Sequence, residues 1–283
     1  MDSGGKSMSM GDSTHVFSKL LTWNIQGLGN SKCMLERKNL RQEFKAPSFK
    51  GVLDILLLQE HHLSANRILS IGNPLEGDWH TFWLVAQGEH DRKEGVCTSI
   101  RNSPDVVVAG QDTIVEGCAI YVTIKWYQCI IGILNVYAPN SSTEWALFSR
   151  QLVDGLPIVD AWILVGDFNM TLYKEDKVGG MQMVVEGSKL VSWDLLMGRM
   201  GMKVAWHVLK KPQSSPSFSR VACSMNGFCM SRIVKFYISS KMENFRTNVE
   251  IIAGSPYSDH MLVKITLVRQ RRPARECNIV HGI

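Results

Sequence analysis

Short apolar runs that end in polar, chemistry-bearing side chains are the feature of this sequence that most constrains its fold. The run Ile55–Leu58 is followed by Gln59 and Glu60, and the run Trp162–Gly166 is followed by Asp167. Continuous apolar runs of this length, rich in Val, Ile and Leu, are typical of strands that are buried on both faces. The pattern therefore predicts a core of buried strands whose ends carry polar groups.

Short β-rich runs alternate with longer helical patterns along the chain. Strands are predicted at Lys19–Trp23, Asp54–Gln59, Thr81–Val85, Asp105–Ala109, Cys118–Lys125, Cys129–Tyr137, Ala161–Val165, Ile233–Ser239 and Leu262–Val268. Helices are predicted at Ser31–Phe44, Thr143–Leu156 and Ser188–Met200, and loops at Gly72–Asp78 and Lys210–Ser219. The alternation predicts an α/β fold, but the pattern alone leaves open a doubly wound parallel sheet or two packed mixed sheets.

The composition is that of an ordinary globular protein. The chain has 283 residues, of which 45% are hydrophobic, so it can bury a large core without disulfides. The net charge of +5 permits a nucleic-acid partner but does not require one. Seven cysteines without CxxC spacing predict reduced thiols and argue against a zinc site.

We expect three segments along the chain. Residues 1–17 are rich in Ser, Gly and Met and are expected to be disordered, 18–268 to form one domain, and 269–283 to form a basic tail. The start lacks the apolar region of a secretory signal, and no apolar run is long enough to span a bilayer. We therefore expect an intracellular protein without a membrane partner.

Five islands of polar residues at the ends of apolar runs carry the candidate chemistry. Their members are Asn24, Glu60, Tyr137, Asp167, Asn169, Asp259 and His260. Each one alone has a structural explanation, such as a turn or a cap. Together, at one edge of a sheet, they supply carboxylates, amides, a phenol and a histidine, without a candidate Ser or Cys nucleophile. This inventory suits a phosphate and a hard metal ion, Mg²⁺ or Mn²⁺, held by oxygen ligands from Glu60 and Asn24.

The motifs themselves resemble a known family. The segments LTWNIQGLG, LLLQE, ILNVYAPN, ILVGDFNM and EDKVGG, followed by the Asp259-His260 pair, occur in this order. They resemble the endonuclease/exonuclease/phosphatase superfamily, and most closely the AP-endonuclease-like endonuclease domain of plant non-LTR (LINE-type) retroelements. The resemblance covers Lys19 to Val268. It implies a DNase I-like, four-layered α/β sandwich, in which two mixed sheets pack face to face with helices outside.

The resemblance also implies which of the candidate residues bind a divalent metal, Mg²⁺ or Mn²⁺. Asn24 and Glu60 hold the ion, with Glu60 as the main ligand. Asp259 supports either the metal side or the histidine.

The remaining implied roles are catalytic. Tyr137 contacts the scissile phosphate, and Asp167 positions or deprotonates the attacking water. Asn169 orients Asp167 and the phosphate. His260, next to Asp259, contacts the phosphate and stabilises the transition state.

One position departs from the family pattern in a way that bears on catalysis. The family carries an Asp in a Ser-Arg-aliphatic-Asp stretch, and that Asp holds the catalytic histidine. Here the stretch is Ser231-Arg232-Ile233-Val234, so Val234 stands where the Asp is expected. Valine cannot accept a hydrogen bond from an imidazole, so we expect His260 to lose the group that fixes its tautomer, unless Asp259 substitutes.

Three functional hypotheses remain open from the sequence. The first is a Mg²⁺-dependent phosphodiesterase that nicks DNA, either fully active or weakened by the valine at position 234. The second is a catalytically inactive DNA-binding remnant or domesticated domain, and the third is a phosphatase that acts on a small phosphoester. For the first we expect DNA as the partner, no protein partner, a monomer and a nuclear location.

Overall fold

The computed structural model describes most of the chain between residues 17 and 269. The described ranges are 17–28, 53–71, 77–85, 94–104, 106–126, 128–179, 187–205, 218–224, 227–242, 245–252 and 258–269. The predicted helix Ser31–Phe44, most of the two predicted loops, and residues 1–16 and 270–283 lie outside these ranges. The first strand begins at Phe17, one residue before the expected start of the domain.

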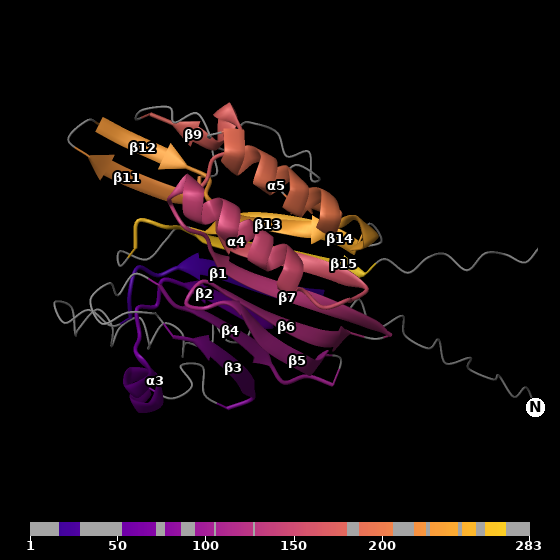
Figure 1. The fold of residues 1–283 in the computed structure, drawn as a ribbon. Helices are drawn as coiled ribbons and strands as arrows, with labels where there is room; N and C mark the ends of the chain where they lie inside the picture. The colour runs from indigo at the N-terminus through magenta and orange to yellow at the C-terminus, as the bar shows by residue number, and fades with distance from the viewer. Residues whose placement is uncertain are drawn as a thin grey trace, which may run out of the picture.

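Two six-stranded mixed sheets form the frame of the molecule (Figure 1). The first has the order β14 (Phe245–Ile252), β15 (Leu262–Arg269), β1 (Phe17–Asn24), β2 (Ile55–Gln59), β4 (Val96–Arg101), β3 (Trp79–Leu84). The second has the order β10 (Met202–Val204), β13 (Val234–Ser239), β8 (Ala161–Asp167), β7 (Cys129–Tyr137), β6 (Ala119–Trp126), β5 (Val106–Val115). Each sheet contains one parallel pair, β1 with β2 and β7 with β8, among antiparallel neighbours.

A third, small sheet stands at the edge of the second. It consists of β11 (Arg220–Ser224), β12 (Gly227–Ser231) and β9 (Lys177–Val178), all antiparallel. The short helix η2 (Lys174–Asp176) precedes β9, and η3 (Ser240–Met242) follows β13. In η2, Asp176 accepts hydrogen bonds from Arg232 and Lys235, so a buried charge cluster ties this sheet to β13.

The main hydrophobic core lies between the two large sheets. Alternate residues of β13, namely Val234, Phe236 and Ile238, face this core with apolar residues of β1, β2 and β15. The intervening Tyr237 faces the opposite side and packs in the helix layer. Complete burial of one such aliphatic or aromatic side chain contributes about 1.5–3 kcal/mol, so this interface accounts for much of the folding free energy.

Helices α4 (Ser142–Gly155) and α5 (Gly187–Met200) cover the outer face of the second sheet (Figure 1). The N-cap residue of α4 is Ser141, whose side chain accepts a hydrogen bond from the backbone N–H of Glu144. Trp145, Phe148 and Leu152 form the buried face of this helix. The short helix α3 (Ala65–Ile71) contributes Ile68 to a cluster on the outer face of the first sheet. None of the helices in the described ranges has both the length and the apolar character needed to cross a bilayer.

This arrangement confirms the predicted fold of two packed mixed sheets with helices outside. All nine predicted strands are present, as are the two predicted helices that lie in the described ranges, with ends shifted by a few residues. Strands β4, β9, β10, β11, β12 and β14 and helix α3 were not predicted. The longest of these, β14, carries Arg246, Thr247, Asn248 and Glu250 at the edge of its sheet, so it lacks the apolar signature of a buried strand.

Candidate active site

Two pairs of parallel strands deliver the candidate residues to one edge of the two sheets. In the first sheet, Asn24 at the end of β1 lies opposite Gln59 at the end of β2, and Glu60 follows directly. In the second sheet, Tyr137 at the end of β7 lies opposite Asp167 at the end of β8. The two strands of a parallel pair end at the same edge of their sheet. The residues at their ends therefore lie next to each other.

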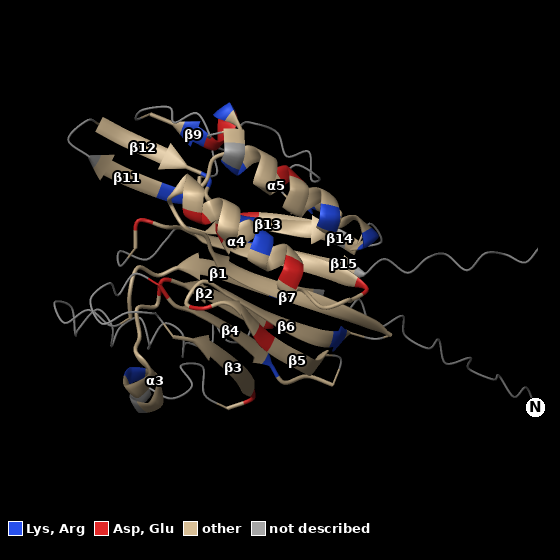
Figure 2. Cartoon of the chain, viewed as in Figure 1, with Lys and Arg blue, Asp and Glu red and all other residues tan. Residues whose placement is uncertain are grey.

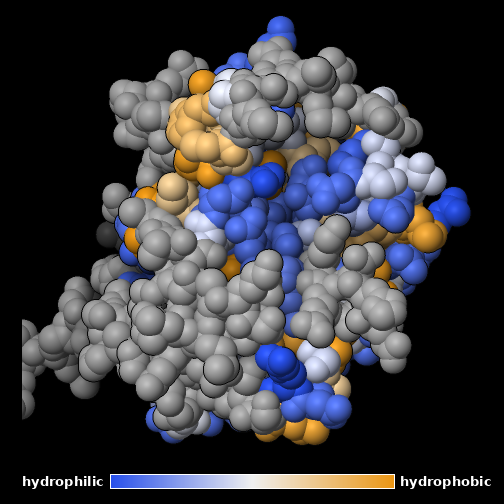
Figure 3. Space-filling view, turned by 90° about the vertical axis from the view of Figure 1, so that its left-hand side faces the viewer, coloured by the Kyte–Doolittle hydropathy of each residue, from blue (hydrophilic) through white to orange (hydrophobic). Residues whose placement is uncertain are grey.

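This edge is the left-hand side of Figure 1, where β1 ends. Figure 3 views the molecule from that side and shows hydrophilic residues gathered across the middle of the face.

The side chain of Asn24 joins the two sheets at the centre of the site. Its Nδ2 donates to Oε1 of Glu60 at 2.7 Å and to Oδ2 of Asp167 at 2.8 Å. Its Oδ1 accepts the backbone N–H of Gln26 at 3.1 Å, which fixes the orientation of the amide. Asn24 and Asp167 are fully buried. The structure therefore brings together two predicted metal ligands and the predicted base.

The two carboxyl groups have pKa values that are shifted in opposite directions. Burial raises the pKa of Asp167, and the nearby His260 and the hydrogen bond from Asn169 offset only part of this rise. Burial also acts to raise the pKa of Glu60, but hydrogen bonds from His62 and Asn24 outweigh it, so this pKa lies below its ordinary value. Asp167 is therefore a stronger base than an exposed aspartate, whereas Glu60 stays ionised.

Tyr137 and Asn169 complete the second-sheet side of the site. Burial raises the pKa of Tyr137 far above its ordinary value, and the negative charges of Glu60 and Asp167 add to this effect. The phenol is therefore a hydrogen-bond donor at neutral pH. The backbone N–H of Asn169 donates to Oδ1 of Asp167 at 2.9 Å, and its side chain donates to the carbonyl of Ala138 at 2.8 Å.

Backbone strain is concentrated at this edge. In the described ranges, the non-glycine residues with positive φ are Gln26 (48°), Glu60 (52°), His62 (55°) and Asn169 (47°). Each follows the end of a strand that delivers a candidate residue, and each adopts a conformation that few non-glycine residues use. Such strain clusters at functional sites, where the surrounding contacts impose it.

The segment that carries Asp259 and His260 is anchored to the end of β1. Oγ of Ser258 donates to the carbonyl of Asn24 at 2.7 Å, and the backbone N–H of Asp259 donates to Oε1 of Gln26 at 3.2 Å. Nε1 of Trp23 donates to the carbonyl of His260 at 3.1 Å. These contacts place the histidine beside Asp167.

His260 lies between two carboxylates but forms no side-chain hydrogen bond with either. Its Nδ1 is 3.6 Å from Oδ2 of Asp167, and its Nε2 is 3.3 Å from Oδ1 of Asp259. Both are ion-pair distances. Among the described residues, however, neither Nδ1 of His260 nor Oδ1 of Asp259 has a hydrogen-bond partner. Val234 is buried directly opposite Asp167 in the β13–β8 pairing, and its apolar side chain cannot accept a hydrogen bond from an imidazole. The loss of an orienting carboxylate at position 234, and its replacement by Asp259, both stay predictions.

Asp259 sits on the histidine side of the site. Its Oδ2 accepts a hydrogen bond from Nε of Arg220 at 2.9 Å, and its Oδ1 faces His260. Its predicted part in metal binding stays a prediction.

A buried amide layer beneath the site was not anticipated from the sequence. Nε2 of Gln59 donates to Oδ1 of Asn135 at 2.7 Å, across the two sheets. Nδ2 of Asn135 donates in turn to the carbonyl of Cys97 at 2.9 Å, and Oε1 of Gln59 accepts from Thr22 at 3.2 Å. Buried amide side chains are nearly always hydrogen-bonded. Amides that interrupt two apolar strands could therefore have indicated this layer from the sequence. This layer links the two sheets beside Asn24, whose strand partner is Gln59.

A second unanticipated contact supports Glu60. Nε2 of His62 lies 3.2 Å from Oε2 of Glu60, while Oε1 is taken by Asn24. Both carboxylate oxygens are therefore held in place.

The donor set at the centre fits a hard divalent cation. Glu60 and Asp167 present carboxylate oxygens, which Nδ2 of Asn24 links, while Oδ1 of Asn24, the atom that could bind an ion, accepts the N–H of Gln26. In the part of the chain that the structure describes, no group of three or more His, Cys, Asp or Glu side chains is arranged to hold an ion. Amide, solvent or substrate oxygens have to complete such a site, which is how proteins usually hold Mg²⁺.

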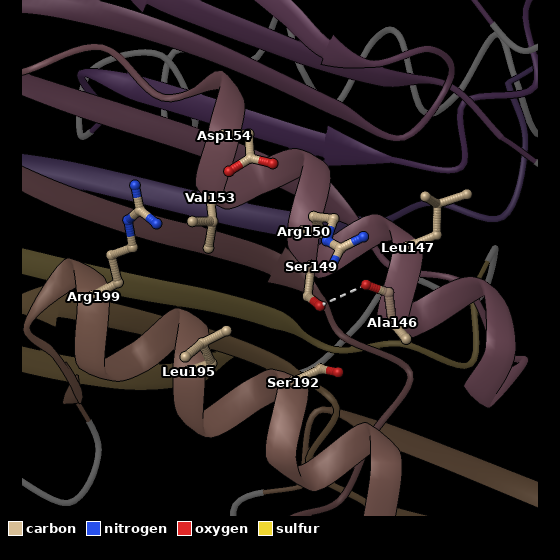
Figure 4. A pocket seen from close by; sticks show the side chains of 9 residues that line it. All are labelled: Ala146, Leu147, Ser149, Arg150, Val153, Asp154, Ser192, Leu195 and Arg199. Carbon is tan, nitrogen blue, oxygen red and sulfur yellow. Dashed lines mark hydrogen bonds between the residues drawn. The ribbon is translucent and has the colours of Figure 1, made fainter.

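A groove on the helix layer lies elsewhere. It has a volume of about 540 Å³ and runs between α4 and α5, where Leu147, Val153 and Leu195 line it with Arg150 and Arg199 (Figure 4). None of the candidate site residues borders it. It is therefore separate from the chemistry at the sheet edge.

Comparison with known proteins matches this architecture. The sequence model of the Endonuclease/Exonuclease/phosphatase family matches residues 21–271. The "Transposon TX1 uncharacterized 149 kDa protein" of Xenopus laevis is 24% identical over 252 residues, covering 86% of this chain. The match spans only 18% of that relative, so most of the longer protein has no counterpart in this comparison.

Solved structures share the fold at low sequence identity. The AP endonuclease LMAP from Leishmania major superposes with a TM-score of 0.74 at 17% identity, covering 91% of this chain and 88% of that one. The endonuclease domain of TRAS1, a telomere-specific non-LTR retrotransposon, superposes with a TM-score of 0.59 at 12% identity, covering 90% of this chain and 100% of that one.

Proposed function

Because the chain belongs to the Endonuclease/Exonuclease/phosphatase family, we propose that it is a Mg²⁺-dependent phosphodiesterase that nicks DNA. The observation that supports this most is the bridge that Asn24 makes between Glu60 and Asp167. It couples an ionised carboxylate, suited to holding a cation, to a buried carboxylate with a raised pKa, suited to accepting a proton.

In this proposal, the chain's own residues prepare the attack on phosphorus. Asp167 accepts a proton from water, while the backbone N–H of Asn169 keeps its carboxylate in position. The water oxygen bonds to phosphorus as the bond to the 3′ oxygen breaks, and the leaving oxygen takes up a proton from solvent. Tyr137 donates a hydrogen bond to a non-bridging oxygen, and His260 contacts the same phosphate. A cation held by Glu60 and Asn24 would neutralise charge on the phosphate oxygens.

DNA is proposed as the substrate on the basis of the relatives. The two solved relatives described above are an AP endonuclease and the endonuclease domain of a retrotransposon. The net charge of +5 is compatible with a polyanionic substrate.

Relaxation of supercoiled plasmid tests the proposal. With Mg²⁺, the purified chain is expected to convert supercoiled plasmid to open circles, and EDTA is expected to abolish the conversion. Folded protein that binds the plasmid without nicking it would favour the inactive DNA-binding domain. Release of phosphate from small phosphoesters, with intact plasmid, would favour the phosphatase.

A further inference from the structure

The first residue of β11 is an arginine that lies against the catalytic histidine. Arg220 pairs with His260 in an isolated antiparallel bridge. The flanking backbone hydrogen bonds run from Val221 N to Asp259 O and from Met261 N to Ser219 O, both at 2.8 Å. This pattern is that of a non-hydrogen-bonded pair, in which the opposed side chains lie closest and on the same face. The side chains of Arg220 and His260 are therefore neighbours at the site.

The guanidinium of Arg220 is only partly used by the protein. Its Nε donates to Oδ2 of Asp259 at 2.9 Å, which fixes the plane of the group. Within the described ranges this is the one hydrogen bond and ion pair of the guanidinium, so no described residue uses the edge formed by its two Nη groups. The side chain is 38% exposed, so a polymer can reach it. Figure 2 shows the basic start of β11 beside the segment that precedes β15.

The surroundings keep this arginine charged and place it near the centre of the site. Burial acts to lower the pKa of Arg220, but the hydrogen bond to Asp259 outweighs it, so the pKa is raised. The negative charges of Asp167 and Glu60 contribute to this rise. Arg220 is also the bridge partner of His260, whose Nδ1 lies 3.6 Å from Oδ2 of Asp167.

From these contacts we propose that Arg220 binds a phosphate of the DNA substrate through its Nη edge, with Asp259 acting as the group that aims it. The proposal rests on the proposed nuclease function and extends it by naming a substrate contact. An arginine edge matches two phosphate oxygens, and a fixed guanidinium loses less freedom on binding than a mobile one. The contact supplies a permanent positive charge beside a histidine that lacks its usual carboxylate at Val234.

A purely structural role for Arg220, as a clamp on Asp259, makes a different prediction. A clamp would affect stability and the position of His260, but it would not change the number of phosphates that the protein neutralises. A phosphate contact changes that number, and the salt dependence of DNA affinity reports it.

The test is DNA affinity without divalent metal, measured by fluorescence anisotropy with a labelled duplex at several KCl concentrations in EDTA. The variants are Arg220→Gln and Arg220→Lys, with Arg150→Gln as the matched control. Arg150 is an exposed arginine on α4, in the groove away from the site. Thermal unfolding of each variant shows whether it is folded.

Arg220→Gln is expected to weaken binding about tenfold at moderate salt and to reduce the slope of log affinity against log salt by about 0.9. Arg220→Lys should keep the parent slope, because it keeps the charge, and Arg150→Gln should match the parent. If Arg220→Gln keeps the parent's salt slope, or if Arg150→Gln loses as much DNA affinity, the proposed phosphate contact is overturned. Neither result bears on the proposed nuclease activity. An Arg220-dependent slope in a chain that never nicks DNA would support the contact and overturn the proposed nuclease.

Discussion

Replacement of Val234 by aspartate tests whether His260 lacks an orienting carboxylate. Val234 is 1% exposed and lies opposite Asp167. The bond from Phe168 N to Ile233 O marks them as a non-hydrogen-bonded pair. The Cβ atoms of such a pair lie about 4.5–5.5 Å apart. Since Oδ2 of Asp167 is already 3.6 Å from Nδ1 of His260, a carboxylate at position 234 comes within reach of the same nitrogen.

Two opposing effects determine how much Val234→Asp changes the nicking rate and the stability. A hydrogen bond from the imidazole to an ionised carboxylate contributes about 1.5–3 kcal/mol, and each 1.4 kcal/mol at the transition state is about tenfold in rate. Two ionised carboxylates about 5 Å apart repel by about 3 kcal/mol at an effective dielectric constant of about 20, unless the imidazolium between them offsets it. We therefore expect Val234→Asp to nick about tenfold faster, and to lower the free energy of unfolding by about 2–3 kcal/mol.

The assay compares single-turnover nicking rates and melting temperatures. Val234→Asn presents an uncharged acceptor and should give a smaller gain, whereas Val234→Ala offers no acceptor and should give none. The gain from Val234→Asp should vanish in a His260→Ala background. If Val234→Asp folds and nicks no faster than the parent, another group already orients His260. Asp259, 3.3 Å from Nε2, would then be the candidate.

Three further outcomes are expected. Asp167→Asn should lower the nicking rate far more than DNA affinity, and equal losses would place Asp167 in binding instead of chemistry. Gly166→Ala should destabilise the fold by about 3 kcal/mol or more in urea unfolding, because a Cβ at this φ of +142° would lie 1.9 Å from the carbonyl of Val136; an unchanged midpoint would refute this. Burial lowers the pKa of His61 from 6.5 to about 4, so protonation favours the unfolded chain, and stability should fall by up to about 3 kcal/mol as the pH drops through that interval. His61→Gln should lack this component, and the same pH dependence in both proteins would contradict the assignment.

The fold could be predicted where local pattern and burial agree. The runs before Gln59 and Asp167 are buried at every position. Their continuous apolar sequence was therefore enough to predict a strand. The resemblance then decided between one doubly wound sheet and two packed sheets. β14 was missed because its polar residues suit an edge strand, whose identity comes from pairing with β15 and not from its own pattern.

The sequence indicated the members of the candidate site but not the hydrogen bonds between them. The sequence pointed to Asn24, Glu60 and Asp167 as separate strand ends, but the amide bridge between the two carboxylates depends on how the two sheets pack. Arg220 carried no signal, because it lies in a stretch without a recognisable pattern. Only its pairing with His260 reveals its place.

The most direct test of the central claim is Mg²⁺-dependent nicking of supercoiled plasmid by the parent chain and by Glu60→Ala. Glu60 is held by Asn24 and His62 at the end of a buried strand, where it can serve as the main ligand of the cation. The parent should produce open circles with Mg²⁺ and none in EDTA, and Glu60→Ala should unfold cooperatively but fail to nick. A folded Glu60→Ala variant that nicks at the parent rate would contradict the proposed metal-dependent site.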